Sequence, residues 1–186
     1  MNTIILLPLL TFIICLITWS YILAQNRKSP VNRAYLVLSG VISGWNVLNL
    51  IIWSPIPRDA QLFFLRFSPL FWVPVGFLFL NFVYVVINKR RDYLYFTSLI
   101  ITVIAVILCL ASKLVVAKPQ MNWFGYSQQN GPFYDITLIM VIVLPVIYAL
   151  ALVSRSSRRS TNRTQKKNLS LILWGGDFRF IGSLLH

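Results

Sequence analysis

Long apolar runs separated by short polar gaps dominate this chain. Five runs reach about the 20 residues that a helix needs to cross the hydrocarbon core of a bilayer; they cover residues 3–24, 34–53, 67–87, 93–116 and 136–153. Unpaired backbone amides are too costly in hydrocarbon, and the sequence has no ten-residue alternation typical of a membrane β-barrel, so the runs predict helices. We therefore predict an all-α fold, a polytopic transmembrane helix bundle with five secure spans.

A sixth apolar segment begins at Leu169 but carries Asp177 and Arg179 near its middle. Each charge costs roughly 2.5–3.5 kcal/mol at the centre of a spanning helix. Residues two apart do not face each other on a helix, so the two charges cannot offset one another well. We expect one membrane-embedded domain, 1–186, with helices at about 3–24, 34–53, 60–87, 93–116 and 136–153 and a partial sixth helix at 169–186.

Composition supports a membrane location, since 58% of the residues are hydrophobic and only 11% are charged, against about 25% charged in soluble domains. The 17 Lys and Arg residues outnumber the 4 acidic residues. Twelve of the basic residues follow the first, third and fifth predicted helices, and four lie in the other gaps. This distribution is typical of the positive-inside rule, so we predict an external N-terminus and exclude nucleic acid as a partner.

Candidate chemistry is sparse. The single histidine is His186, and Cys15 and Cys109 lie inside apolar runs without metal-ligand spacing. With no paired carboxylates, nucleophile–base set or phosphate-binding glycine loop in the sequence, we predict no enzyme activity, no cofactor and no metal. Coupled transport is disfavoured because Asp59, Asp92 and Asp135 fall at helix ends, whereas a coupling carboxylate is expected near the middle of the membrane.

Small and amide residues mark positions where helices could meet. Gly40 and Gly44 have the GxxxG spacing that lets a second helix approach closely, so we predict a helix-packing role for both. Asn46, Asn49 and Asn81 lie in apolar helices, where they either bond across helices or line a polar cavity. The cross-helix interpretation is favoured, and Asn81 is kept as a candidate ligand-binding residue.

Helix irregularities are expected at three prolines. Pro69 and Pro74 lie in the third helix and Pro145 in the fifth, where each frees a backbone carbonyl and can kink the helix. Arg66, just before the third apolar core, is expected to extend toward the headgroups, in preference to pairing with Asp59 two turns away.

The gap at 117–135 is the densest aromatic feature of the sequence, with WFGY at 123–126 and GPFY at 131–134. Such a gap is either an aromatic belt at the membrane interface or a ligand-binding loop shaped by its glycines. The belt is favoured. The candidate ligand-binding residues of the second interpretation are Trp123, Tyr126 and Phe133.

Several of these motifs, taken in their order along the chain, make the sequence resemble the N-terminal seven-transmembrane (7TM) sensor region of bacterial histidine kinases. The residues that carry the resemblance are Asn32-Arg33-Ala34 with Trp45, Leu65-Arg66 before Pro74 and Asn81-Phe82, the WFGY and GPFY loop, and Gln165-Lys166-Lys167. The similarity covers most of residues 1–176. It implies a non-catalytic input region of a two-component system, a multi-pass protein of the bacterial inner membrane that senses a signal and relays it to a cytoplasmic output module.

The chain departs from that pattern in its sixth helix, where the resemblance is truncated before a seventh helix or any output module. We therefore expect signalling through a separate output chain, membrane lipid as a contact, a homo-oligomer as a further option, and a ligand that the sequence does not identify. The alternative is a small transport or channel-type subunit that assembles through Gly40 and Gly44.

Overall fold

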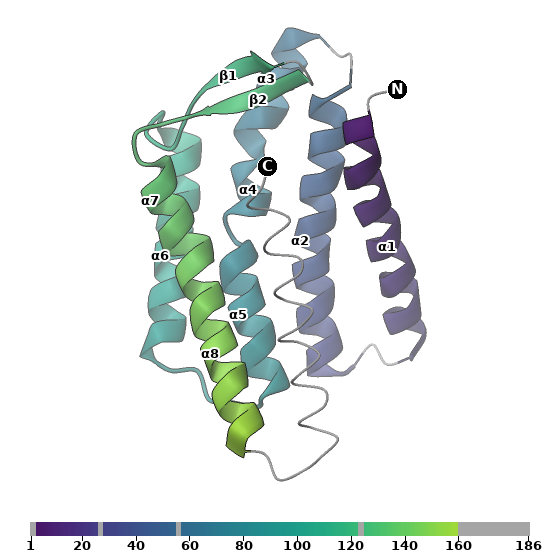
Figure 1. Cartoon of the computed structure of the whole chain (residues 1–186), viewed down its shortest axis with the longest axis vertical. Coiled ribbons are helices and arrows are strands. Elements are labelled where there is room, and N and C mark those ends of the chain that lie inside the picture. Colours follow the sequence, from purple (N-terminus) through teal and green to yellow (C-terminus); the bar gives the residue numbers. More distant parts are fainter. Residues whose placement is uncertain (1–2, 26–27, 55–56, 123–124, 160–186) are drawn as a thin grey trace.

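A computed structural model describes residues 3–25, 28–54, 57–122 and 125–159. Within these residues, five helices are long and apolar enough to cross a membrane (Figure 1). The predicted fold class, an all-α transmembrane bundle with five secure spans, is confirmed. The partial sixth helix predicted at 169–186 lies outside the described residues.

The spans differ in regularity. The first two are continuous, α1 (Thr3–Gln25) and α2 (Pro30–Ile52), and so is the fourth, α6 (Tyr93–Ala111). The third is divided into α3 (Arg58–Phe67), α4 (Pro69–Trp72) and α5 (Val75–Val86). The fifth consists of α7 (Tyr134–Leu138), the π-helical turn η1 (Ile139–Val143) and α8 (Leu144–Arg159). All three prolines at which an irregularity was predicted thus lie at or beside a helix interruption, because proline lacks the N–H that a continuous helix needs.

Several predicted helix ends need correction. The helix expected at 34–53 begins at Pro30, since proline is well tolerated in the first turn of a helix. The helix expected at 93–116 ends at Ala111, where Ser112 turns extended and its hydroxyl donates to the Leu108 carbonyl. The helix expected at 136–153 runs to Arg159, beyond the apolar run, because charged residues continue a helix readily once it has left the hydrocarbon.

The aromatic gap, expected as a loop, contains an antiparallel hairpin of β1 (Val116–Asn122) and β2 (Gly125–Asn130). Met121 pairs with Tyr126 in its register. Backbone bonds dock the hairpin on the bundle, from Gly131 N–H to the Val115 carbonyl at 2.8 Å and from Phe133 N–H to the Leu114 carbonyl at 3.0 Å. A Cβ at Gly131 would lie 2.7 Å from the Lys113 carbonyl oxygen, so this approach requires glycine.

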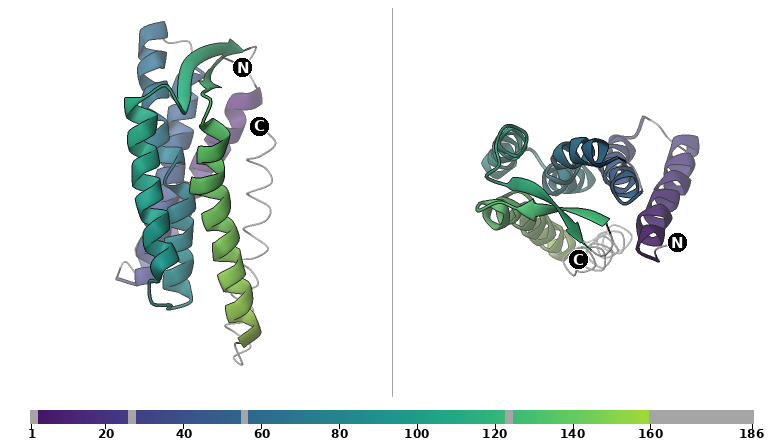
Figure 2. Two further views of the ribbon diagram at one scale, coloured as in Figure 1. Left: turned by 90° about the vertical axis from the view of Figure 1, so that its left-hand side faces the viewer. Right: turned by 90° about the horizontal axis from the view of Figure 1, so that it is seen from above.

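The bundle has two different ends (Figures 1 and 2). The hairpin covers one end, which we call the hairpin end. The α1–α2 connection, the α5–α6 connection and the last turn of α8 lie at the other, which we call the basic end because Lys28, Lys89, Arg90, Arg91, Arg155 and Arg158 lie there.

The helices are packed in sequence from one side of the bundle to the other. α1 lies at the edge against α2, α2 packs on α5, and α5 packs on both α6 and the last helix. The cluster of buried residues nearest the basic end joins α5, α6 and α8; it consists of Leu80, Val83, Tyr84, Tyr95, Ala149, Leu152 and Val153.

Candidate functional site

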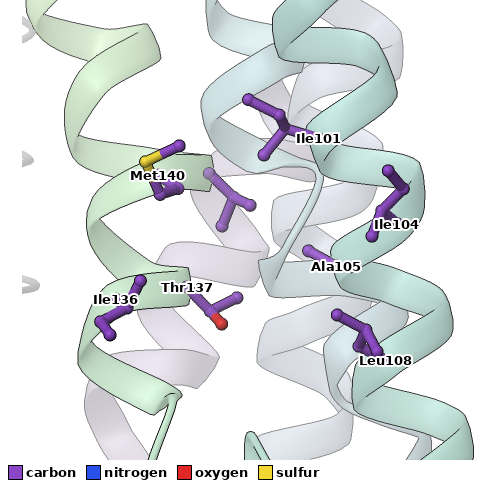
Figure 3. Close-up of a pocket in the computed structure, with 8 residues that line it drawn as sticks. Ile101, Ile104, Ala105, Leu108, Ile136, Thr137 and Met140 are labelled. Atoms are coloured by element: carbon purple, nitrogen blue, oxygen red, sulfur yellow. The ribbon is translucent and has the colours of Figure 1, made fainter.

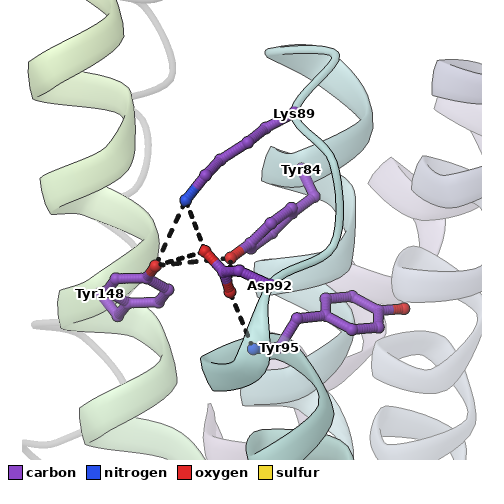
Figure 4. Close-up of polar contacts among 5 residues, drawn as sticks. All are labelled: Tyr84, Lys89, Asp92, Tyr95 and Tyr148. Carbon is purple, nitrogen blue, oxygen red and sulfur yellow. Dashed lines mark hydrogen bonds and ion pairs between the residues drawn. The ribbon is translucent and has the colours of Figure 1, made fainter.

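A polar cluster joins α5, α6 and α8 at the basic end (Figure 4). Its centre is the Asp92 carboxylate. Tyr84 Oη of α5 donates to Asp92 Oδ1, and Tyr148 Oη of α8 donates to Oδ2 at 2.9 Å. Lys89 Nζ forms an ion pair with Oδ2 at 2.6 Å. One carboxylate therefore joins the neighbouring helices α5 and α6 to α8, whose Tyr148 is 56 residues away in the sequence.

Local sequence signals place the two charged residues. α5 ends in a Schellman motif: Asn88 has a positive φ of 50°, its N–H donates to the Val85 carbonyl, and Lys89 N–H donates to the Tyr84 carbonyl. Asparagine tolerates this conformation better than most residues. Asp92 then caps α6 by accepting a bond from Tyr95 N–H at 3.2 Å. The helix stop at Asn88 and the helix start at Asp92 thus bring Lys89 and Asp92, three residues apart, together.

The cluster also favours the charged forms of both residues. Partial burial by itself would raise the pKa of the Asp92 carboxyl, but hydrogen bonds from Lys89, Tyr84 and Tyr148 together hold that pKa well below its usual range. Burial would lower the pKa of Lys89, yet its bonds to Asp92 and Tyr148 raise it. The Lys89 ammonium lies 5.1 Å from the ring centroid of Tyr84 and 5.6 Å from that of Tyr148, a cation–π arrangement.

Asn81 lies beside this cluster. Its Oδ1 accepts a 2.8 Å bond from Tyr95 Oη, so the amide joins α5 to α6. The Tyr95 ring is buried and packs against the rings of Phe77 and Tyr84. This contact is the cross-helix arrangement that the sequence favoured over a polar cavity.

Of the other candidate ligand-binding residues, Tyr126 and Phe133 lie at the hairpin end. Trp123 is outside the described residues; Tyr126 lies in β2, and its side chain is not described. Phe133 is 49% exposed. The structure does not bring Asn81 together with Phe133, because Asn81 lies within α5, bonded to Tyr95, whereas Phe133 lies at the start of α7 beside the hairpin (Figure 1). Ligand binding by Trp123, Tyr126 and Phe133 stays a prediction.

Gly40 and Gly44 face two different neighbours. A Cβ at Gly40 would lie 3.1 Å from Trp19 Cζ2 of α1, and one at Gly44 would overlap the Phe71 ring of α4. The same Trp19 donates from Nε1 to Ser39 Oγ at 2.7 Å. The two glycines are thus placed against different helices, and their packing role stays a prediction.

Asn46 Nδ2 donates to the Ile42 carbonyl within α2, whereas a cross-helix bond was favoured from the sequence. Arg66 and Asp59 are both exposed on α3, and no ion pair joins them among the described residues.

A shallow apolar groove opens between α6 and the α7–η1 part of the fifth span (Figure 3). Its volume is about 180 Å³. Thr137 supplies the one polar side chain among the lining residues, which are Ile101, Ile104, Ala105, Leu108, Ile136, Thr137, Met140 and Val141. Its lining offers hydrocarbon contact and has no charged group.

Sequence reasoning missed the polar cluster. It used Asp92 only as a helix-end carboxylate that argues against coupled transport, and it did not single out Tyr84, Lys89 or Tyr148 as site residues. The pair of signals Asn88 and Asp92, a helix stop followed by a cap, could have identified the ion pair. Tyr148 could not have been found this way, because it is 56 residues from Asp92.

Comparisons with known proteins bear on the whole chain. No curated protein and no solved structure matches it. The family model of the N-terminal 7TM region of histidine kinase matches residues 6–186, nearly the entire sequence. The resemblance seen in the sequence is confirmed, and the chain belongs to the family of histidine kinase N-terminal 7TM regions.

Proposed function

We propose that this membrane region receives a signal and relays it through its fifth span, at α8, toward a kinase output module. The observation that carries the proposal is the shared Asp92 carboxylate, which links α8 to the α5–α6 connection through Tyr148. α8 is the last helix of the described chain and continues past the apolar run at the basic end. A change in this link would therefore alter the position of α8 at the basic end.

The orientation belongs to the same proposal. We place the basic end in the cytoplasm and the hairpin end outside, because Lys and Arg flanking spanning helices concentrate on the cytoplasmic side. A periplasmic reporter fused after Gln128 is expected to be active and one fused after Arg91 silent. The reverse result at both sites would contradict the orientation.

A chimeric kinase tests the relay. The chain, joined in frame to a histidine kinase catalytic core, is reconstituted in vesicles, and autophosphorylation is compared between wild type and Tyr148→Phe. The substitution removes one hydroxyl and leaves the ring, so the bundle should remain folded while the link to Asp92 is lost. We expect kinase output to change at least about threefold, which corresponds to a shift of about 0.7 kcal/mol between two output states.

The matched control is Ile147→Leu, one residue earlier in α8, whose side chain is 56% exposed on the membrane face. It should leave output unchanged. Equal output from wild type and Tyr148→Phe at equal membrane abundance would contradict the relay. Solute flux through vesicles containing the chain alone would instead support the transport or channel-type alternative.

A further inference from the structure

The backbone of the fifth span is irregular near its middle. In η1 the Leu144 N–H bonds to the Ile139 carbonyl five residues earlier, the spacing of a π-helix. Pro145 follows directly and has no N–H to offer the Val141 carbonyl four residues before it. One turn of this span is therefore wider than an α-helical turn, and the α-helical partner of one of its carbonyls is missing.

Gly76 of α5 lies against that turn. A Cβ on Gly76 would lie 2.7 Å from Ile142 Cα and would overlap the Val141 carbonyl oxygen. The two backbones thus meet without an intervening side chain, and the carbonyl that Pro145 cannot bind faces the glycine. Gly76 itself follows Pro74, where α4 and α5 are interrupted. Two interrupted helices therefore touch at their irregular points.

The fifth span is held differently on the two sides of this contact. On the hairpin side, the segment leading into α7 is fastened by the backbone bonds of Gly131 and Phe133 to the end of the fourth span. The Tyr134 ring also packs on Trp72, with centroids 5.8 Å apart. On the basic side, the described contacts of α8 are made by side chains: Tyr148 in the polar cluster and apolar residues against α5.

We propose that η1 is a hinge, at which α8 swings about the Gly76–Val141 contact while α7 stays fixed, and that the Tyr148–Asp92 bond is the latch that holds α8. A π-helical turn is suited to this role because π-bulges are among the places where helices kink, and they occur frequently at functional sites. Its use in signalling rests on the proposed relay function, whereas the motion itself does not.

The size of the motion follows from helix geometry. Arg158 lies 17 residues beyond Val141, so at 1.5 Å per residue it is about 25 Å from the hinge. A change of about 20° in a helix kink would move it by about 9 Å.

Spin-label distances in the full chain in lipid vesicles test the hinge. Cys15 and Cys109 are first replaced by alanine. One label pair, at Arg90 and Arg158, reports on the basic side, and a second, at Leu110 and Ile136, reports on the hairpin side; all four side chains are exposed. The latch is released with Tyr148→Phe. We expect the Arg90–Arg158 distance to shift or broaden by about 9 Å and the Leu110–Ile136 distance to stay unchanged.

A second variant tests whether η1 is the hinge. Deleting Met140 from the Tyr148→Phe protein removes one residue from the wide turn, which converts it to an α-helical turn and should narrow the Arg90–Arg158 distribution again. If the deletion does not fold, Pro145→Ala restores an N–H for the Val141 carbonyl and should have the same effect. Ile147→Leu in place of Tyr148→Phe serves as the control and should leave both distances as in wild type.

Three results would overturn the hinge: an unchanged Arg90–Arg158 distance after latch release, equal shifts of both pairs, or a broad distribution that survives in the folded Met140 deletion or Pro145→Ala protein. The chimeric kinase separates this proposal from the relay. Shifted distances with unchanged kinase output would leave the hinge standing and remove its signalling role.

Discussion

The edge helix α1 and the last helix α8 are both apolar spans, yet the bundle holds them in different ways. α1 packs on α2 and contributes Trp19, whose indole bonds Ser39 and covers Gly40. α8 contributes three core residues, Ala149, Leu152 and Val153, and its Tyr148 donates a hydrogen bond to the Asp92 carboxylate. α1 thus packs mainly on α2, whereas α8 contacts both α5 and the start of α6.

The difference shows where a stimulus can have an effect. Within the described part of the chain, α1 packs mainly on α2 and can shift with little change in the other helices, whereas movement of α8 must break or reform the contacts of Asp92. Within the hydrocarbon, apolar surface by itself does not distinguish the two, since lipid replaces apolar contacts at little cost. Close backbone approach and hydrogen bonds make the distinction, so the predictions below target those contacts.

The largest effect is expected for Gly76→Ala. The new Cβ would overlap the Val141 carbonyl oxygen, and backbone cannot move aside as a side chain can. We expect a loss of about 3 kcal/mol, measured as a lower thermal midpoint and lower folded yield in detergent. Gly40→Ala is the matched control, because its Cβ would meet only the edge of Trp19, 3.1 Å away, and alanine favours the helix. Equal stability of the two variants would show that the contact of Gly76 with the fifth span is no closer than the contact of Gly40 with α1.

Gly44→Leu should cost less, about 2 kcal/mol. Its side chain would overlap the Phe71 ring, which can rotate or shift because it is only half-buried. Val37→Leu in the same helix, at a position that is 54% exposed, should be neutral. Wild-type yield and thermal stability for Gly44→Leu would show that this face does not pack closely.

Asp92→Asn should destabilise the α8 side by about 1 kcal/mol, because the asparagine keeps an acceptor for the tyrosines but loses the charge partner of Lys89. The figure is modest because about a third of each charged side chain is exposed to solvent. Thermal unfolding in detergent measures it, and Asp135→Asn at the exposed start of α7 is the control.

The same cluster predicts a pH dependence. The folded-state pKa of Asp92 lies below its usual range, so its contribution is present above the unfolded pKa of about 3.9 and is lost as the pH falls through the depressed value. The raised pKa of Lys89 makes its contribution complete below its unfolded value of about 10.4. The stability difference between wild type and Asp92→Asn should therefore be constant from about pH 5 to 9 and shrink in acid. A difference that disappears near neutral pH would contradict the assignment.

The smallest effect is expected for Trp19→Phe. It removes the bond to Ser39, and interhelical hydrogen bonds in membranes contribute about 0.6 kcal/mol on average. The loss should stay local to α1, so spin-label distances at Arg90 and Arg158 should not change. A shift of that pair would show that α1 is coupled to the α8 side after all.

Much of the architecture could be predicted from apolar run length, because the requirement for a satisfied backbone in hydrocarbon leaves few alternatives. The helix irregularities predicted at Pro74 and Pro145 were also placed correctly. The end of α6 could not be placed in this way, since Leu114, Val115 and Val116 continue the apolar run past Ser112 and Lys113 but lead into β1. The hairpin was missed because aromatic and polar residues in a membrane gap are equally typical of a belt, a loop or a strand pair.

The sequence alone determined the class of protein, the five spans, the charge asymmetry and the family, because hydropathy, charge and motif order are properties of the chain itself. Only the tertiary structure decided that Tyr84 and Tyr148 both donate to the Asp92 carboxylate and that Gly76 touches the π-helical turn. The physical reason is the geometry of packing: which faces of two apolar helices meet depends on their rotation and depth relative to each other, and apolar residues that face lipid or protein equally well do not encode either one.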